Sequence, residues 1–282
     1  MSGIAFVKGH GTENDFVLLP DPDAALDLTD ERVRALCDRH RGLGADGVLR
    51  ALPTTAVPEA HGSTSDWFMD YRNADGSVAE MCGNGVRVFA RYLVEAGLAR
   101  PGEFAVGTRA GDRVVTVPAN DPAGTVTVRM GQATVTGRST ASLRGRSIDG
   151  IVVDVGNPHL ACVVTDPVAG LDLTVPPGYD TAVFPHGVNV EFLNEPSAGV
   201  LRMRVHERGV GETRSCGTGT IAAVAAALHL AGETEGHRTV LVPGGQVEVT
   251  VTATDSTLAG PAVLPAHGEL SAEWWADAAK QR

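Results

Sequence analysis

Lysine is almost missing from this chain of 282 residues, which has two lysines, Lys8 and Lys280, against 21 arginines. A pyridoxal-phosphate enzyme needs a lysine in its site to form a Schiff base. With one lysine near each terminus, that chemistry is not expected. Cysteine is also scarce, because the four residues are scattered and no two form a C-x-x-C pair. This spacing excludes a disulfide scaffold.

The chain lacks any apolar run of the roughly 20 residues that a membrane helix needs. Its N-terminus lacks the basic and apolar segments of a signal peptide. A cytoplasmic location without a membrane partner is therefore expected. The formal net charge of −11 argues against a nucleic-acid surface and leaves recognition of an anionic substrate to local groups. The remaining composition is that of an ordinary soluble protein, long enough for one large domain or two.

At two places a cysteine precedes a Gly-x-Gly turn, and a helical pattern follows. After Cys82, apolar residues recur at the spacing of one buried helix face, namely Val86, Phe89, Ala90, Leu93 and Val94. After Cys216, the apolar run 221–231 predicts a second helix. Both cysteines then lie at a helix N-terminus, where N–H groups and the helix dipole lower a thiol pKa and bind a carboxylate. The repetition predicts two halves that face one site.

The long separation of the two cysteines is typical of a duplicated domain rather than a short repeat. We expect an N-terminal domain over residues 1–122 and a C-terminal domain over 123–267, with 268–282 packing back on the first. Local patterns predict two strands within 4–20, a helix over 30–40, an exposed excursion over 53–65, a linker over 119–124 and a hairpin over 240–247.

Five motifs in order resemble the diaminopimelate epimerase family over nearly the whole chain. They are residues 8–16, the turn 73–77, residues 80–84, the turn that contains His159 and the run 206–219. This resemblance implies an α+β fold of two pseudo-symmetric domains. In each domain a mixed β-sheet wraps a central helix, and the active site lies in the cleft between the domains.

The resemblance also implies the activity, an isomerase that interconverts LL- and meso-2,6-diaminopimelate for lysine and peptidoglycan synthesis. It implies no cofactor and no metal, and it makes Cys82 and Cys216 the acid/base pair. Inverting an α-carbon means removing a proton from one face and delivering one to the other, which two thiols do without a base that moves. Like charges disfavour two neighbouring thiolates, so one cysteine must begin as a thiolate and the other as a thiol.

The remaining site residues are carried over from the family in three groups. Backbone amides hold the reacting carboxylate and its developing negative charge, an oxyanion-hole role assigned to Gly83, Asn84, Gly217 and Thr218. Asparagines in or beside turns hold the distal end of the substrate, namely Asn14, Asn73, Asn157 and Asn189. Glu207 faces an ammonium group, and Arg208 grips a carboxylate with its planar fork. His159 and Glu207 tune the thiol pKa values.

Other positions depart from the family or lack its turn. Gly47 stands where many relatives have glutamine, so no substrate contact is expected there. Ala266 stands where some relatives have an aromatic residue at a dimer contact, so a homodimer is possible but does not depend on this position. Cys37 and Cys162 have no Gly-x-Gly turn after them and are interpreted as structural.

Three alternative functions remain open. A proline or hydroxyproline racemase shares the fold and the paired cysteines, but its cysteine is usually followed by Gly-His, whereas Cys82 is followed by Gly-Asn-Gly. A non-catalytic amino-acid-binding protein would explain the carboxylate-binding turns and Arg208, but not two thiols. A cysteine hydrolase needs one nucleophile and a base, which leaves the second cysteine turn unexplained.

Overall fold

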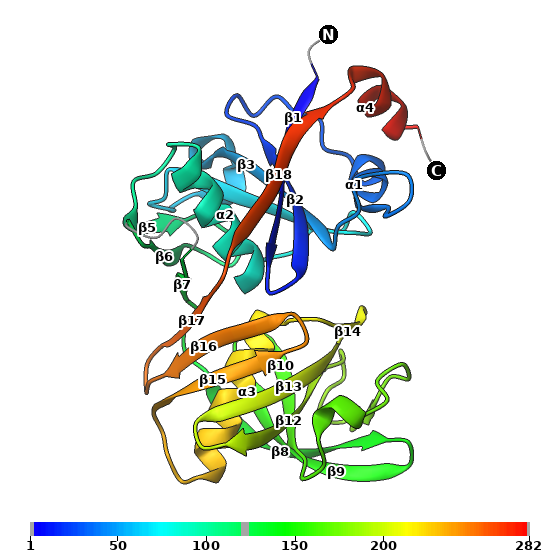
Figure 1. The fold of residues 1–282 in the computed structure, drawn as a ribbon, viewed down its shortest axis with the longest axis vertical. Coiled ribbons are helices and arrows are strands. Elements are labelled where there is room, and N and C mark those ends of the chain that lie inside the picture. The colour runs from blue at the N-terminus through cyan, green and yellow to red at the C-terminus, as the bar shows by residue number, and fades with distance from the viewer. Residues whose placement is uncertain (1–2, 120–123, 281–282) are drawn as a thin grey trace. The chain divides into compact units, whose positions relative to one another are not determined.

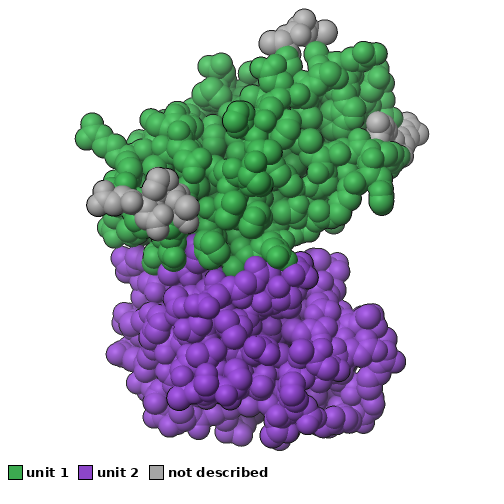
Figure 2. Space-filling view, in the orientation of Figure 1, with its two compact units in different colours: residues 1–128, 261–282 green, residues 129–260 purple. Residues whose placement is uncertain are grey.

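The computed structural model describes residues 3–119 and 124–280, which form two compact units. Unit 1 consists of residues 1–128 and 261–282, and unit 2 of residues 129–260 (green and purple in Figure 2). The boundary predicted between residues 122 and 123 lies outside the described residues, as does most of the predicted linker. Within the described ranges, no helix has the length and apolar character needed to span a membrane.

Unit 1 is built on a five-stranded mixed sheet in the order β18-β1-β2-β3-β4. Its strands are β1 (Ile4–Gly11), β2 (Asn14–Pro20), β3 (Gly47–Pro53), β4 (Trp67–Asn73) and β18 (Val263–Leu270). Only the β2–β3 pair is parallel among these neighbours. The two strands predicted within 4–20 are therefore confirmed. The last strand, β18, comes from the far end of the sequence and pairs with β1, as Figure 1 shows.

Three more strands of this part of the chain form an antiparallel set: β5 (Gly102–Val106), β6 (Arg113–Val117) and β7 (Val126–Arg129). The helix predicted over 30–40 is α1 (Asp30–Cys37), with Thr29 as its N-cap. It ends three residues early because the Asp38 carboxylate accepts the backbone N–H groups of His40 and Arg41 at 2.8 and 2.9 Å. A short helix, α4 (Ala272–Ala278), follows β18.

The segment 53–65 was predicted to be an exposed excursion, and this is only partly correct. It contains two single turns of 3₁₀ helix, η1 (Thr54–Ala56) and η2 (Pro58–Ala60). Between them Val57 is 9% exposed and packs with Leu52 and Phe68 in a small apolar cluster. The apolar side chain therefore anchors the excursion to the sheet.

The helix predicted after Cys82 is α2 (Gly83–Glu95), and it is the central helix of unit 1. Strands β1 to β4, β6 and β18 all contact it. The sequence predicted one buried face, but the structure buries every residue from Gly83 to Leu93, including Arg87 and Arg91. A helix enclosed on all sides has little freedom to shift. The residue at its start is therefore held at a defined position.

Unit 2 has one mixed sheet in the order β11-β8-β9-β10-β12-β13-β15-β16-β17, with β14 beside β13. Its strands are β8 (Thr134–Leu143), β9 (Arg146–Asp154), β10 (Pro158–Val163), β11 (Gly178–Tyr179), β12 (Asn189–Ser197), β13 (Val200–Glu207), β14 (Gly211–Thr213), β15 (Gly236–Val242), β16 (Gly245–Val251) and β17 (Ser256–Gly260). A single 3₁₀ turn, η3 (Val168–Gly170), follows β10. The pairs β10–β12 and β13–β15 are parallel, and the β15–β16 hairpin was predicted.

The second predicted helix is α3 (Gly217–Leu230), which the strands of unit 2 surround in Figure 1. Contacts run to β8, β9, β10, β12, β13 and β15 to β17. Its length is lined with small and branched apolar residues such as Ile221 and Val224, both fully buried. Each unit therefore combines a mixed sheet with one enclosed helix that starts directly after a cysteine. The α+β fold class is confirmed.

Candidate active site

Cys82 is the N-cap residue of α2, in an extended conformation, and its side chain is half-buried. Its Sγ accepts the backbone N–H of Gly85 at 3.4 Å. The amides of the first helical turn have no carbonyl acceptor within the helix. The predicted helix start, with Gly83 and Asn84 in the first turn, is therefore observed. We call Cys82, Asn14, Asn84 and Arg87 the N-terminal half-site.

Asn14 brings a second chain segment to Cys82. Its Oδ1 accepts from the Cys82 thiol at 3.7 Å and from the side-chain amide of Asn84 at 3.2 Å. Its own Nδ2 donates to the Asp46 carboxylate at 2.8 Å. This last contact fixes the amide, so that its oxygen points toward the thiol. Two of the asparagines selected from the sequence thus converge on one cysteine.

Arg87 lies one turn into α2 and is fully buried, a residue that the sequence analysis did not select. Its guanidinium donates to Asn84 Oδ1 at 2.6 Å and to the carbonyl oxygen of Pro261 at 3.0 Å, and it forms no ion pair with a described carboxylate. Burial lowers its pKa to about 10, and the nearby Cys82 thiolate opposes that change. A buried cation beside a thiol favours the thiolate. The sequence analysis used only the apolar positions of this helix, so it did not identify Arg87 as buried.

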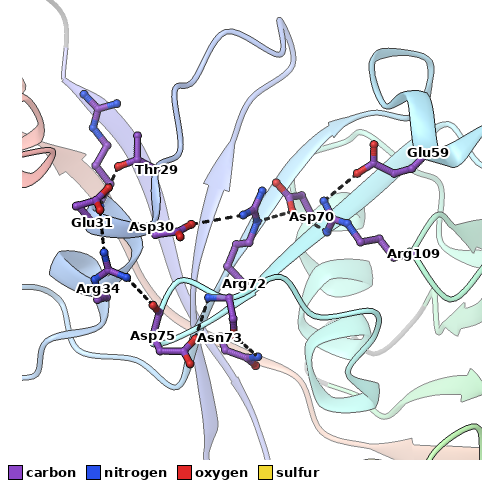
Figure 3. Close-up of polar contacts among 12 residues, drawn as sticks. Thr29, Asp30, Glu31, Arg34, Glu59, Asp70, Arg72, Asn73, Asp75 and Arg109 are labelled. Carbon is purple, nitrogen blue, oxygen red and sulfur yellow. Dashed lines mark hydrogen bonds and ion pairs between the residues drawn. The ribbon is translucent and has the colours of Figure 1, made fainter.

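Asn73 ends β4, and its side chain bonds within its own turn. Its Nδ2 donates to Ser77 Oγ at 3.0 Å, and the Asp75 carboxylate accepts the Ser77 backbone N–H at 2.8 Å. Figure 3 shows Arg34 reaching the Asp75 carbonyl oxygen from α1, at 2.8 Å. The turn is thus tied to a neighbouring helix. A direct role for Asn73 at a substrate stays a prediction.

The two departures from the family pattern lie on the sheet of unit 1. Gly47 pairs with Asn73 across β3 and β4. A Cβ atom at Gly47 would lie 2.6 Å from the carbonyl oxygen of Arg72 and 2.8 Å from the Tyr71 ring. This position therefore has no space for a side chain. Ala266 lies in β18 opposite Lys8.

Cys216 is the N-cap of α3 and is 7% exposed, with its Sγ 3.6 Å from Thr218 Oγ1. Burial raises the pKa of this thiol well above its ordinary value, and the carboxylates of Glu207 and Glu191 raise it further. The sequence analysis expected a lower pKa at the helix start. For Cys216 that expectation is wrong, because burial, together with Glu207 and Glu191, raises the pKa more than the hydrogen bonds from Thr218 and Gly219 lower it.

His159 lies on β10 beside β12, where its parallel partner is Asn189. Its Nδ1 is 2.7 Å from Glu191 Oε1 and its Nε2 is 3.0 Å from Asn157 Oδ1. The structure therefore pairs His159 with Glu191, which the sequence analysis did not select. The sequence did contain a pattern that places Glu191 near Asn189: the two residues are two positions apart in a predicted strand, so their side chains share one face.

Asn189, Glu207 and Arg208 gather where β13 ends. Asn189 Oδ1 accepts the backbone N–H of Arg208 at 2.9 Å, and Glu207 accepts a hydrogen bond from the Thr213 hydroxyl. The Arg208 guanidinium donates to the carbonyl oxygen of His186 at 3.2 Å and forms no ion pair with any carboxylate in the described ranges. Glu207 and Arg208 line a pocket of about 370 Å³ in unit 2, together with Tyr179, Val188, Val190 and His206.

The other two cysteines differ from this pair. Cys37 and Cys162 are buried, and burial raises the pKa of each to about 12. Neither precedes a helix, which agrees with the structural interpretation. Among the residues that the structure describes, no group of three or more histidine, cysteine or acidic side chains could hold a metal ion.

Gly219 provides the first test of this geometry. A methyl group there would lie 2.8 Å from Glu191 Oε1 and 3.3 Å from Cys216 Sγ. We expect Gly219→Ala to lower kcat/KM roughly 100-fold, because the methyl group would displace the Cys216 thiol, which the family resemblance implies as an acid and base, and a misplacement of about 1 Å has that effect. Gly137→Ala is the matched control, since nothing lies within 4 Å of the added carbon. Equal activity of the two variants in an epimerisation assay would contradict a close approach of carboxyl and thiol.

The sequence model of the family described as diaminopimelate epimerase matches residues 6–136 and 151–265. The chain belongs to the diaminopimelate epimerase family. Relatives named diaminopimelate epimerase include one from Mycolicibacterium gilvum, 58% identical over 96% of this chain and 98% of the relative. A second, from Rhodococcus jostii, is 56% identical over the same shares. The family predicted from the five motifs is thus confirmed.

Solved structures with the same fold are more distant from this diaminopimelate epimerase family member. A hydroxyproline epimerase from Agrobacterium vitis, with bound trans-4-hydroxy-L-proline, is 17% identical with a TM-score of 0.70, covering 96% of this chain and 91% of that one. A PhzF-family phenazine biosynthesis protein from Bacillus anthracis is also 17% identical, with a TM-score of 0.69, covering 96% and 100%. At this identity they support the fold alone.

Proposed function

We propose that this chain interconverts LL- and meso-2,6-diaminopimelate, with Cys82 and Cys216 as a two-base pair that needs no cofactor. Its family assigns it to the isomerases, as the sequence predicted, and connects it to lysine biosynthesis. The observation that carries the mechanism is the opposite environment of the two thiols. Cys82 lies near a buried guanidinium that has no described carboxylate partner, whereas Cys216 lies near two carboxylates.

This contrast supports different protonation states of the two cysteines before the substrate reacts. A neighbouring cation favours a thiolate at Cys82, and burial with neighbouring anions favours a thiol at Cys216. In one direction, the Cys82 thiolate forms an S–H bond as the C–H bond of the α-carbon breaks. The electron pair moves into the substrate carboxylate as an enediolate, and Cys216 gives its proton to the opposite face. In the other direction, the roles are exchanged.

The backbone amides at the two helix starts are suited to the charge that develops on the carboxylate. Gly83 and Asn84 begin α2, and Gly217 and Thr218 begin α3. Donors that are already oriented stabilise an enediolate more than the ground-state carboxylate, since the enediolate carries more charge on oxygen. These amides would thereby lower the barrier to proton removal.

The distal amino-acid group of diaminopimelate requires a carboxylate site and an ammonium site. Arg208 offers a planar donor fork with no ion-pair partner among the described carboxylates, and Glu207 offers a neighbouring negative charge. Asn189 holds the backbone of Arg208 in place. These contacts support binding of a second amino-acid head, which proline does not have. Roles for Asn14, Asn73 and Asn157 at the distal end remain predictions.

The function is tested by proton NMR in heavy water with LL- and meso-diaminopimelate and, separately, with proline and hydroxyproline. We expect loss of the α-proton signal and formation of the other isomer with diaminopimelate only. Exchange with proline or hydroxyproline alone would instead assign the chain to the racemases of the same fold. Binding of diaminopimelate without any exchange would support the binding-protein alternative.

Two further expectations also stay predictions. The family acts on a small molecule, which agrees with the partner expected from the sequence. The possible homodimer and the cytoplasmic location that were expected from the sequence and the family resemblance stay predictions.

A further inference from the structure

Glu191 is a fully buried carboxyl group with an incomplete set of partners. It lies on β12, has no exposed surface, and binds His159 through Oε1 at 2.7 Å. Among the described residues, its second oxygen, Oε2, has no hydrogen-bond partner. An unsatisfied buried oxygen is destabilising. Such a group in a native structure calls for an explanation, and a role at a functional site is one.

The hydrogen bonds determine where protons lie in this pair. Asn157 Oδ1 can only accept, so the Nε2 of His159 must carry a hydrogen. The bond between Nδ1 and Glu191 Oε1 then holds exactly one more proton, on the nitrogen or on the oxygen. Burial raises the pKa of Glu191, and His159 opposes this shift. The pair therefore carries no net charge in either state, but only the ionic state has a negative carboxylate end.

The carboxylate end of the pair faces the start of α3. A Cβ atom added to Gly219 would lie 2.8 Å from Glu191 Oε1 and 3.3 Å from Cys216 Sγ. No atom of His159 is among the three atoms nearest to that position. The missing side chain of Gly219 is what lets the carboxyl group approach the cysteine. The same oxygen, Oε1, accepts the contact from His159, whose other ring nitrogen lies 3.0 Å from Asn157 Oδ1.

We propose that Glu191 is a positioning residue beside Cys216: it holds the His159 imidazole in place and opposes ionisation of the Cys216 thiol. The proposal rests on the proposed function in one respect, namely that Cys216 is an acid and base of the reaction. It adds a residue to the pair His159 and Glu207 that the family resemblance had suggested. It also explains the buried carboxyl group and the glycine at position 219 together.

The direction in which Glu191 shifts the pKa of Cys216 follows from the charges around this thiol. Glu207 on β13 and Glu191 on β12 both raise the pKa of this thiol, after burial as the largest cause. In the described ranges, the titratable groups around Glu191 include His159 and Cys162 on β10, Glu207 on β13 and Cys216 itself. In the ionic state of the pair, replacement of Glu191 by glutamine removes the negative carboxylate and keeps the shape of the side chain. The pKa of Cys216 should therefore fall.

The experiment is a pH titration of protein labelled with ¹³C at the cysteine Cβ atoms, comparing Glu191→Gln with the wild type. We expect the midpoint of the Cys216 resonance to fall by about one unit, a tenfold change in the thiolate-to-thiol ratio at a given pH. The resonance of Cys37 in unit 1, which takes no part in the proposed reaction, serves as the internal reference. The alkaline limit of kcat/KM for epimerisation should move down in pH with the Cys216 midpoint.

Glu233→Gln is the matched control, because it makes the same chemical change at a half-exposed position of unit 2 that pairs with Arg238. It should leave the Cys216 midpoint unchanged. An unchanged midpoint in Glu191→Gln, in protein whose other resonances show the native fold, would overturn the proposal.

If Glu191→Gln does not fold, Glu191→Asp is titrated instead. Its shorter carboxylate should also lower the midpoint, and an unchanged value would again overturn the proposal. A wild type that titrates as expected but does not epimerise diaminopimelate would contradict only the proposed function.

Discussion

Replacement of either Cys82 or Cys216 by alanine is expected to lower the rate of diaminopimelate inversion by about 1,000-fold or more, the range that general acid–base catalysis contributes. Inversion needs a proton taken from one face and a proton given to the other. One remaining thiol can take a proton and return it only on its own face. Each variant should therefore exchange the α-proton of one isomer for deuterium without inverting it, and the two variants should exchange opposite isomers.

The measurement is proton NMR in heavy water, combined with chiral separation of the isomers. Cys37→Ala and Cys162→Ala are matched controls, one in each unit, and should keep inversion within a few-fold of the wild type. Full inversion by Cys216→Ala would contradict the two-base mechanism, because a single base would then serve both faces. Exchange of the same isomer by both variants would contradict the assignment of one thiol to each face.

Replacement of Arg208 by methionine is expected to raise the KM for diaminopimelate by roughly 10- to 100-fold, since a charge-assisted hydrogen bond contributes about 1.5–3 kcal/mol. The guanidinium binds the carbonyl oxygen of His186 through Nη1 and forms no ion pair with any carboxylate in the described ranges, so its other donors are available to a substrate. A change in distal binding should appear mainly in KM, with a smaller effect on kcat. Initial rates over a range of diaminopimelate concentrations measure both.

Two further variants separate charge from geometry at this position. Arg208→Lys keeps the positive charge but loses the planar fork, so its KM should lie between those of the wild type and Arg208→Met. Arg146→Met is the control, because Arg146 is highly exposed in unit 2 and pairs with Asp166 at 3.4 Å. An Arg208→Met enzyme with an unchanged KM would remove Arg208 from the substrate site.

The secondary structure nearest the cysteines was predictable because its signals are local. A turn with two glycines followed by apolar residues predicts a helix start, and α2 and α3 begin at Gly83 and Gly217 as expected. The hairpin of β15 and β16 has an equally local signal. The early end of α1 was missed because a side chain of the helix end, Asp38, competes with the helix for backbone N–H groups.

The pairing of strands that are distant in the sequence was harder to predict. The parallel contact of β2 with β3 and the pairing of β18 with β1 depend on the packing of distant segments rather than on any local pattern. The burial of Arg87 was missed for the same reason, because helical spacing assigned it to no apolar face while strands of unit 1 enclose the whole helix. Its proximity to Cys82 could not be read from the sequence.

Residue types and their spacing were enough to select Cys82 and Cys216, to set each at the start of a helix and to indicate the family. These properties depend on a few consecutive residues, and the chain carries them before it folds. The ionisation of Cys216 was not accessible in this way, and the expectation of a lower pKa was wrong. It depends on burial and on carboxylates from other strands, and electrostatic interactions follow distance in space rather than position in the chain. For the same reason, the partnership of His159 with Glu191 emerged only when β10 and β12 were side by side.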